Sequence, residues 1–149
     1  MVDKVLTGKE SIATIMRMAS ARGISPAEAG TYLRDVVEGY FSEIEGYLRI
    51  PSKDQALTKI RETYNGIYLL RTKLYRDKTI SSDIPAILQV CVKELKVLED
   101  EVGEQLIPNL SKASLEAIGS RLIRKLKAIH KKISSVQALL LPEERIRRS

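Results

Sequence analysis

The sequence has few of the residues on which most catalytic and metal-binding sites depend. Its 149 residues include one cysteine, one histidine, one phenylalanine and no tryptophan. Cys91 alone cannot close a disulfide within the chain, and without other soft ligands it cannot hold zinc. Its neighbours Val90 and Val92 predict a buried thiol. The sequence also lacks a glycine-rich phosphate loop and a serine nucleophile motif. We therefore expect no cofactor, no metal and no catalytic activity.

Long apolar runs are missing as well. Residues 1–20 carry charged side chains throughout, unlike the apolar segment of a secretory signal peptide. No apolar stretch approaches the ~20 residues that a membrane-spanning helix needs. These features predict a cytoplasmic protein without membrane contact. The scarcity of asparagine and glutamine is typical of proteins from thermophiles.

Patterns typical of strands are absent, and apolar residues recur at the helical spacings of three and four. Helix starts are marked by capping residues. Ser25 and Glu28 have the spacing of a capping box with Pro26 at the first helical position, and Ser111 follows a break at Pro108. The predicted helices span about residues 8–21, 26–49, 53–77, 84–106 and 112–140.

These helices predict an all-α fold, a compact helical bundle of about five helices. We expect a single helical domain over residues 1–149. Within it, residues 1–50 are predicted to form an N-terminal helical hairpin and residues 51–141 a core of three helices. The short charged tail over residues 142–149 is expected to fray.

The positive charge is concentrated in two regions. The net charge is +6, and no acidic residue lies between Glu116 and Glu143. At ~100° per residue, most cations of the helix over 112–140 fall on the side away from its apolar stripe of Leu122, Ile129 and Ile133. The residues predicted to contact nucleic acid are Lys59, Arg61, Arg71, Lys73, Arg121, Arg124, Lys125, Lys131 and Lys132.

A row of cations is what a surface that follows a phosphate backbone requires, because the cations displace condensed counterions together. The alternative is a solvated helix face whose cations pair with acids on neighbouring helices. The helix over 84–106 supplies such acids, namely Glu94, Glu99, Asp100, Glu101 and Glu104. The expected partner is RNA or another nucleic acid.

Two segments resemble a known family. Residues 57–67 begin Leu-Thr-Lys-Ile-Arg, and residues 129–140 contain Val136, Gln137 and Ala138. The first resembles the opening of a core helix, and the second the last helix, of the small subunit of type III CRISPR effector (Csm) complexes. Val136 and Gln137 stand where that family has aromatic residues and glutamate, and residues 1–48 match no part of it.

The resemblance implies a non-catalytic subunit of a ribonucleoprotein effector complex. Such subunits stack head to tail beside the guide RNA and its target, so self-association and contacts with other subunits are expected. Lys59 and Arg61 are the closest matches to the basic positions of the family.

Two other interpretations remain open. Residues 64–74, followed by Ile84 and Pro85, resemble the helical domain of GINS subunits of the DNA replication machinery. Arg124 and His130, with five residues between them, resemble the Arg-x4–6-His motif of HEPN ribonucleases, in which the two side chains act on the scissile phosphate.

Overall fold

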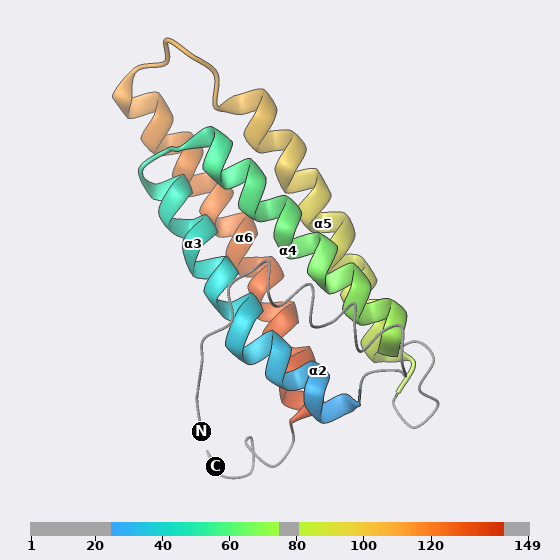
Figure 1. The fold of residues 1–149 in the computed structure, drawn as a ribbon. Coiled ribbons are helices and arrows are strands. Elements are labelled where there is room, and N and C mark those ends of the chain that lie inside the picture. The colour runs from blue at the N-terminus through green and yellow to red at the C-terminus, as the bar shows by residue number, and fades with distance from the viewer. Residues whose placement is uncertain (1–24, 75–80, 142–149) are drawn as a thin grey trace.

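The computed structural model describes residues 25–74 and 81–141, and these form an all-α bundle (Figure 1). The first helical segment runs without a break through α2 (Pro26–Tyr32), the π-helical turn η1 (Leu33–Val37) and α3 (Glu38–Arg49). It is followed by α4 (Lys53–Leu74), α5 (Asp83–Gln105) and α6 (Lys112–Leu140). The predicted helical class is confirmed, with four continuous helical rods in the described residues where about five were expected.

The helix predicted over 8–21 and the tail over 142–149 lie outside the described residues. The other predicted bounds agree with the structure to within a few residues. The Ser25 capping box is confirmed, because the backbone N–H of Glu28 donates to the Ser25 hydroxyl and the N–H of Ser25 donates to the Glu28 carboxylate. Ser111 caps α6 through the N–H of Ser114.

The helices lie side by side along one long axis (Figure 1). Each packs against two neighbours, since α4 contacts α3 and α5, and α6 contacts α5 and α3. The segment over 25–49 was predicted as part of an N-terminal helical hairpin within the single domain. In the structure its side chains Phe41, Ile44 and Leu48 lie in the same apolar core as those of α4, α5 and α6.

Two glycines set the distances between helices. A Cβ atom on Gly119 of α6 would overlap the backbone carbonyl of Leu48 at the end of α3. A Cβ atom on Gly66 of α4 would overlap the hydroxyl of Tyr32 on α2. Close approach at these points holds α6 against α3 and α4 against α2, which fixes where the outer faces of the helices point.

None of the described helices combines the length and apolar character that crossing a bilayer requires.

Candidate nucleic-acid interface on α6

Three cationic side chains of α6 reach across to α5. Lys132 donates to both carboxylate oxygens of Glu94 at 2.7 Å. Lys125 forms an ion pair with Glu101, and Arg121 donates to the side chain of Gln105. We call these three contacts the α5–α6 ladder.

The spacing of the ladder follows from helix geometry. Along α6 its cations are separated by four and then seven residues, and their partners on α5 are separated by four and seven residues in the reverse order. Steps of four and seven return a side chain to nearly the same side of a helix. Two antiparallel helices therefore keep the contacts aligned along their length. The ladder cations are used to join α5 to α6.

A second set of cations on α6 faces outward. Arg124, Lys127 and Lys131 are exposed, and within the described ranges none of their charged groups has a hydrogen bond or ion pair. We call these three residues the outer row. Separations of three and four residues place them along one side of the helix, over ~10 Å of its length.

The outer row is bordered by small side chains. Ser120, Ala128 and Ser135 are exposed residues of the same helix. Among residues 25–74 and 81–141, these small neighbours leave room for a phosphate backbone to approach the long cationic side chains. The strip predicted from the sequence is thus divided in two, with Arg124 and Lys131 in the outer row and Arg121, Lys125 and Lys132 in the ladder.

The cations of α4 do not form a comparable row. Lys59 contacts Glu62 at 2.7 Å and Glu43 at 3.6 Å, and its ammonium lies 4.8 Å from the centre of the Tyr40 ring. Burial alone would lower the pKa of Lys59, but the hydrogen bond and charge of Glu62 and the charge of Glu43 raise it above its ordinary value. The side chain is 17% exposed, so its charge is largely neutralised within the fold.

The remaining predicted cations of α4 are also engaged or covered. Arg61 forms an ion pair with Glu99 of α5, and the same carboxylate accepts a hydrogen bond from Tyr64 at 3.0 Å. Arg71 lies 5.9 Å from the centre of the Tyr68 ring. Lys73 is buried, with 8% of its surface exposed. This burial does not fit the prediction that Lys73 contacts nucleic acid, and it arises because the apolar side of α4 is wide enough to include the lysine.

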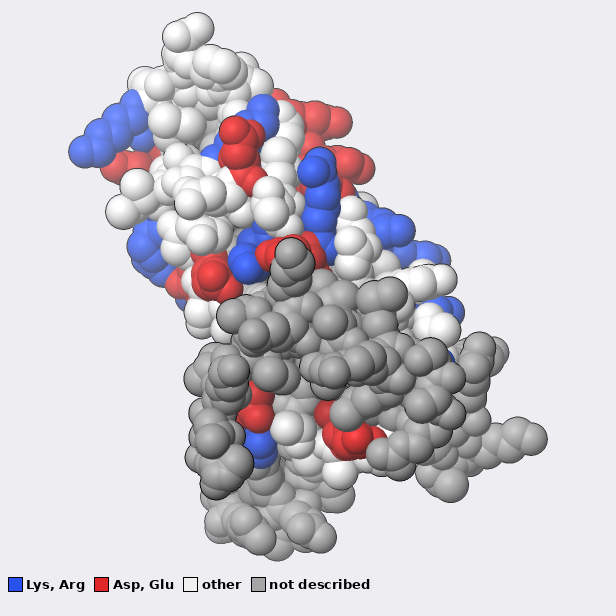
Figure 2. Space-filling view, viewed as in Figure 1, with Lys and Arg blue, Asp and Glu red and all other residues white. Residues whose placement is uncertain are grey.

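Mixed charge is visible on the face formed by α3 and α4. Figure 2 shows lysine and arginine side chains beside aspartate and glutamate side chains over this face. Interleaved charges of both signs reduce the field that a phosphate backbone would experience. The outer row of α6 is therefore the better candidate for the interface.

Comparison with family models, with curated proteins and with solved structures found no match to this chain.

Arg124 and His130, the pair that resembles a ribonuclease motif, do not lie together. His130 pairs through Nε2 with Glu38, and its ring stacks on Phe41 with centroids 4.9 Å apart. Arg124 is six positions away on the same helix, a rotation of about 240°, so the two side chains leave α6 on different sides. Burial raises the pKa of Cys91 to about 12. No cluster of three metal-ligating side chains occurs within residues 25–74 and 81–141.

Lys127 belongs to the outer row but was not among the predicted site residues. Its position three residues after Arg124, in a stretch without acids, was the available signal. To predict the division between ladder and outer row, one would need to know how α6 is rotated relative to α5. The sequence of one helix does not contain this information.

Proposed function

We propose that the chain is a non-catalytic helical subunit that binds the backbone of a nucleic acid through the outer row. The main support for this proposal is the arrangement of the outer row. Arg124, Lys127 and Lys131 are aligned and exposed, and they lack counter-charges among the described residues. Cations of this kind release counterions from phosphates on binding, whereas a cation already paired with glutamate gains less.

The more specific form of the proposal is a small subunit of a type III CRISPR ribonucleoprotein effector complex. It is supported by the resemblance of residues 57–67 and 129–140, by the helical fold and by the place of the outer row, which adjoins the second segment. In this role the chain would contact the guide RNA or its target and pack against other subunits. Because Lys59 and Arg61 already contact glutamates, we expect their contribution to RNA binding to be smaller than that of the outer row.

The test compares two triple variants of the purified chain in binding to a fluorescent single-stranded RNA. In the outer-row variant, Arg124, Lys127 and Lys131 are each changed to Gln. In the ladder variant, Arg121, Lys125 and Lys132 are each changed to Gln, so the change in net charge is the same. The outer-row variant should bind more weakly, and its plot of log K against log salt should be shallower by about 2, since each phosphate contact with a single strand contributes ~0.7.

The ladder variant should keep most of the affinity and most of the salt dependence. Equal losses in the two variants would mean that only net charge matters and would contradict the assignment of the outer row. Absence of any salt-dependent binding by the unaltered chain would overturn the proposal as a whole.

A second experiment decides the biological assembly. The tagged chain is purified from its native cells and the associated RNA is sequenced. Guide RNAs carrying repeat-derived ends would support the CRISPR assignment, whereas replicative helicase components without RNA would favour the GINS-like alternative. Cleavage of RNA by the purified chain that is lost on His130→Ala would favour the ribonuclease alternative and overturn the non-catalytic assignment.

A further inference from the structure

The side of α5 that faces away from the core carries apolar side chains in solvent. Val90 is 43% exposed and Val97 is 56% exposed. The two are separated by seven residues, with Ala86 one turn before Val90. Seven-residue spacing is the repeat by which one helix packs along another. The core-facing side of α5 is already occupied by Leu88, Leu95 and Val102, so this repeat is available for a second contact.

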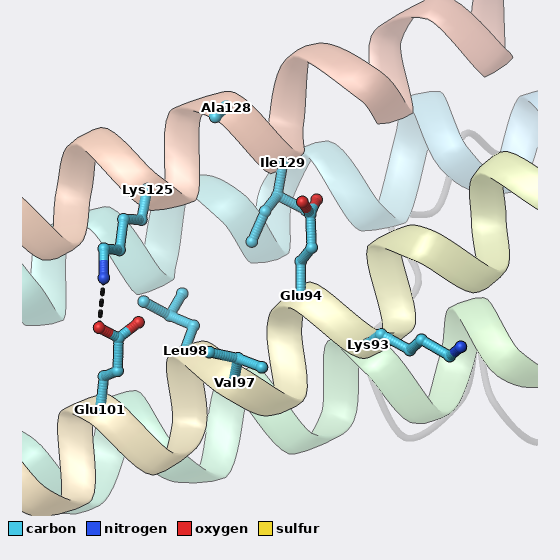
Figure 3. A pocket seen from close by; sticks show the side chains of 8 residues that line it. All are labelled: Lys93, Glu94, Val97, Leu98, Glu101, Lys125, Ala128 and Ile129. Carbon is cyan, nitrogen blue, oxygen red and sulfur yellow. Dashed lines mark hydrogen bonds and ion pairs between the residues drawn. The ribbon is translucent and has the colours of Figure 1, made fainter.

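A groove lies beside Val97, between α5 and α6. Its volume is about 320 Å³, and Val97 and Leu98 of α5 and Ala128 and Ile129 of α6 line it (Figure 3). The Lys125–Glu101 contact of the ladder closes one end (Figure 3). Glu94, paired with Lys132, stands at the other. The two glutamates are two helical turns apart, or ~10 Å. The space between them accommodates an aliphatic side chain from another helix.

The charges along this side of α5 indicate which helix fits. Lys93 precedes Val97 by one turn, and Asp100 and Glu104 follow it. All three are exposed, and none of the three has an ion pair among residues 25–74 and 81–141. Within two turns of Val97, the unpaired charges of this face are therefore positive on one side of Val97 and negative on the other. The electrostatic complement of this face is a helix that carries the same charges in the opposite direction.

We propose that a second copy of this chain docks on α5, with the two α5 helices antiparallel about a two-fold axis near Val97. In this arrangement Lys93 of each copy faces Asp100 of the other, and the contact occurs twice. A parallel arrangement would instead place Asp100 against Asp100 and Glu104 against Glu104, and like charges in opposition disfavour it. Val97 of each copy then lies against the groove of the other.

The resulting interface is isologous, so it closes at two copies. It differs in this respect from a head-to-tail contact, which would continue to add copies. The outer row adjoins this groove, because Ala128 lines the groove and also borders the outer row. The inference does not depend on the proposed function, and either can fail without the other.

The test is sedimentation equilibrium of the full chain over a wide range of concentration. We expect a monomer–dimer equilibrium with no larger species. Lys93→Glu and Asp100→Lys should each raise the dimer Kd about tenfold or more, because each substitution creates two like-charge contacts across the axis. The matched control is Lys112→Glu, which changes the charge equally at an exposed position at the start of α6 and should leave the Kd unchanged.

Mixing the two single variants provides the decisive measurement. The Lys93→Glu variant carries only acids at the two positions, and the Asp100→Lys variant carries only bases. An equimolar mixture should therefore form a heterodimer at concentrations at which each variant alone is monomeric. Because both positions are exposed, the substitutions should not disturb the core. The helical signal in circular dichroism checks that each variant remains folded.

Three results would overturn the proposal. The first is a chain that stays monomeric at every concentration, which would leave the groove to a different protein. The second is association that continues beyond two copies. The third is a failed charge test, in which either the dimer Kd is the same in the variants or the mixed variants do not associate.

Discussion

Lys132 of α6 and Glu94 of α5 are joined by two hydrogen bonds of 2.7 Å, one to each carboxylate oxygen. The contact links residues that are 38 positions apart in the chain. From the sequence of α6 alone, Lys132 would be predicted to face solvent. Lys131, the preceding residue, is exposed in the outer row. One helical step of ~100° thus separates a cation that joins two helices from one that is available to a partner.

This pair should contribute modestly to stability. Both side chains are about 40% exposed, and ion pairs of this kind contribute ~1 kcal/mol or less. A double-mutant cycle with Lys132→Ala and Glu94→Ala, measured by urea denaturation, should give a coupling free energy within that range. The same cycle with Lys131→Ala in place of Lys132→Ala is the control and should give no coupling. Equal coupling in the two cycles would contradict the separation of ladder and outer row.

Substitution of Gly119 tests the close contact of α6 with α3. Gly119→Ala should destabilise the protein by ~1–3 kcal/mol, because the added methyl overlaps the Leu48 carbonyl and the backbone must shift. The control is Gly103→Ala on α5, where a Cβ atom would meet nothing within 4 Å. Since alanine is favoured over glycine within helices by up to ~1 kcal/mol, this variant should be more stable than the parent chain. Thermal or urea denaturation should therefore give changes of opposite sign, and changes of the same sign would refute the contact.

The thiol of Cys91 should make stability depend on pH in alkaline solution. Burial, with a further contribution from Glu94 and an opposing one from Lys132, raises its pKa from 9.0 to about 12. Above pH 9 the unfolded chain releases this proton while the folded chain retains it. The free energy of unfolding should therefore fall as the pH rises from 9 towards 12, at no more than ~1.4 kcal/mol per pH unit from this group.

The measurement is urea denaturation at a series of pH values from about 8 to 9.5, where most tyrosines of the unfolded chain, whose ordinary pKa is about 10, are still protonated. Cys91→Ala should lower the stability at every pH but reduce the slope above pH 9. An unchanged slope in this variant would show that another group is responsible. The folded parent chain should also react slowly with thiol reagents at neutral pH, because Cys91 is fully buried.

Two tyrosines offer a matched comparison. The hydroxyl of Tyr32 is buried, and no hydrogen-bond partner for it occurs in the described part of the chain, whereas that of Tyr64 donates to Glu99 at 3.0 Å. Tyr32→Phe should be neutral or stabilising, since it removes an unsatisfied buried polar group. Tyr64→Phe should cost about 0.5–1.5 kcal/mol. A larger loss for Tyr32→Phe than for Tyr64→Phe in denaturation experiments would contradict this assignment.

The helices and their buried stripes could be predicted because they depend on local spacing. Leu122, Ile129 and Ile133 recur at helical intervals, and all are buried as expected. The contacts of His130 with Glu38 and Phe41 could not be predicted, because they join segments about 90 residues apart. Whether a cation of α6 meets an acid or solvent depends on how far that helix is rotated against α5. Pairing with acids on a neighbouring helix, the alternative interpretation of the strip, is therefore correct for Lys125 and Lys132, whereas Arg121 contacts the amide of Gln105.

The ladder also determines how far α6 can slide along α5. Heptad-like apolar stripes pack almost equally well after a shift of seven residues, so they do not select one alignment by themselves. A shift of α6 by seven residues in one direction would set Glu101 against Ile118, and in the other it would set Glu94 against Leu139. Either error leaves a carboxylate facing an apolar side chain. During folding, the paired charges thus disfavour the two alignments in which α6 is shifted along α5 by seven residues.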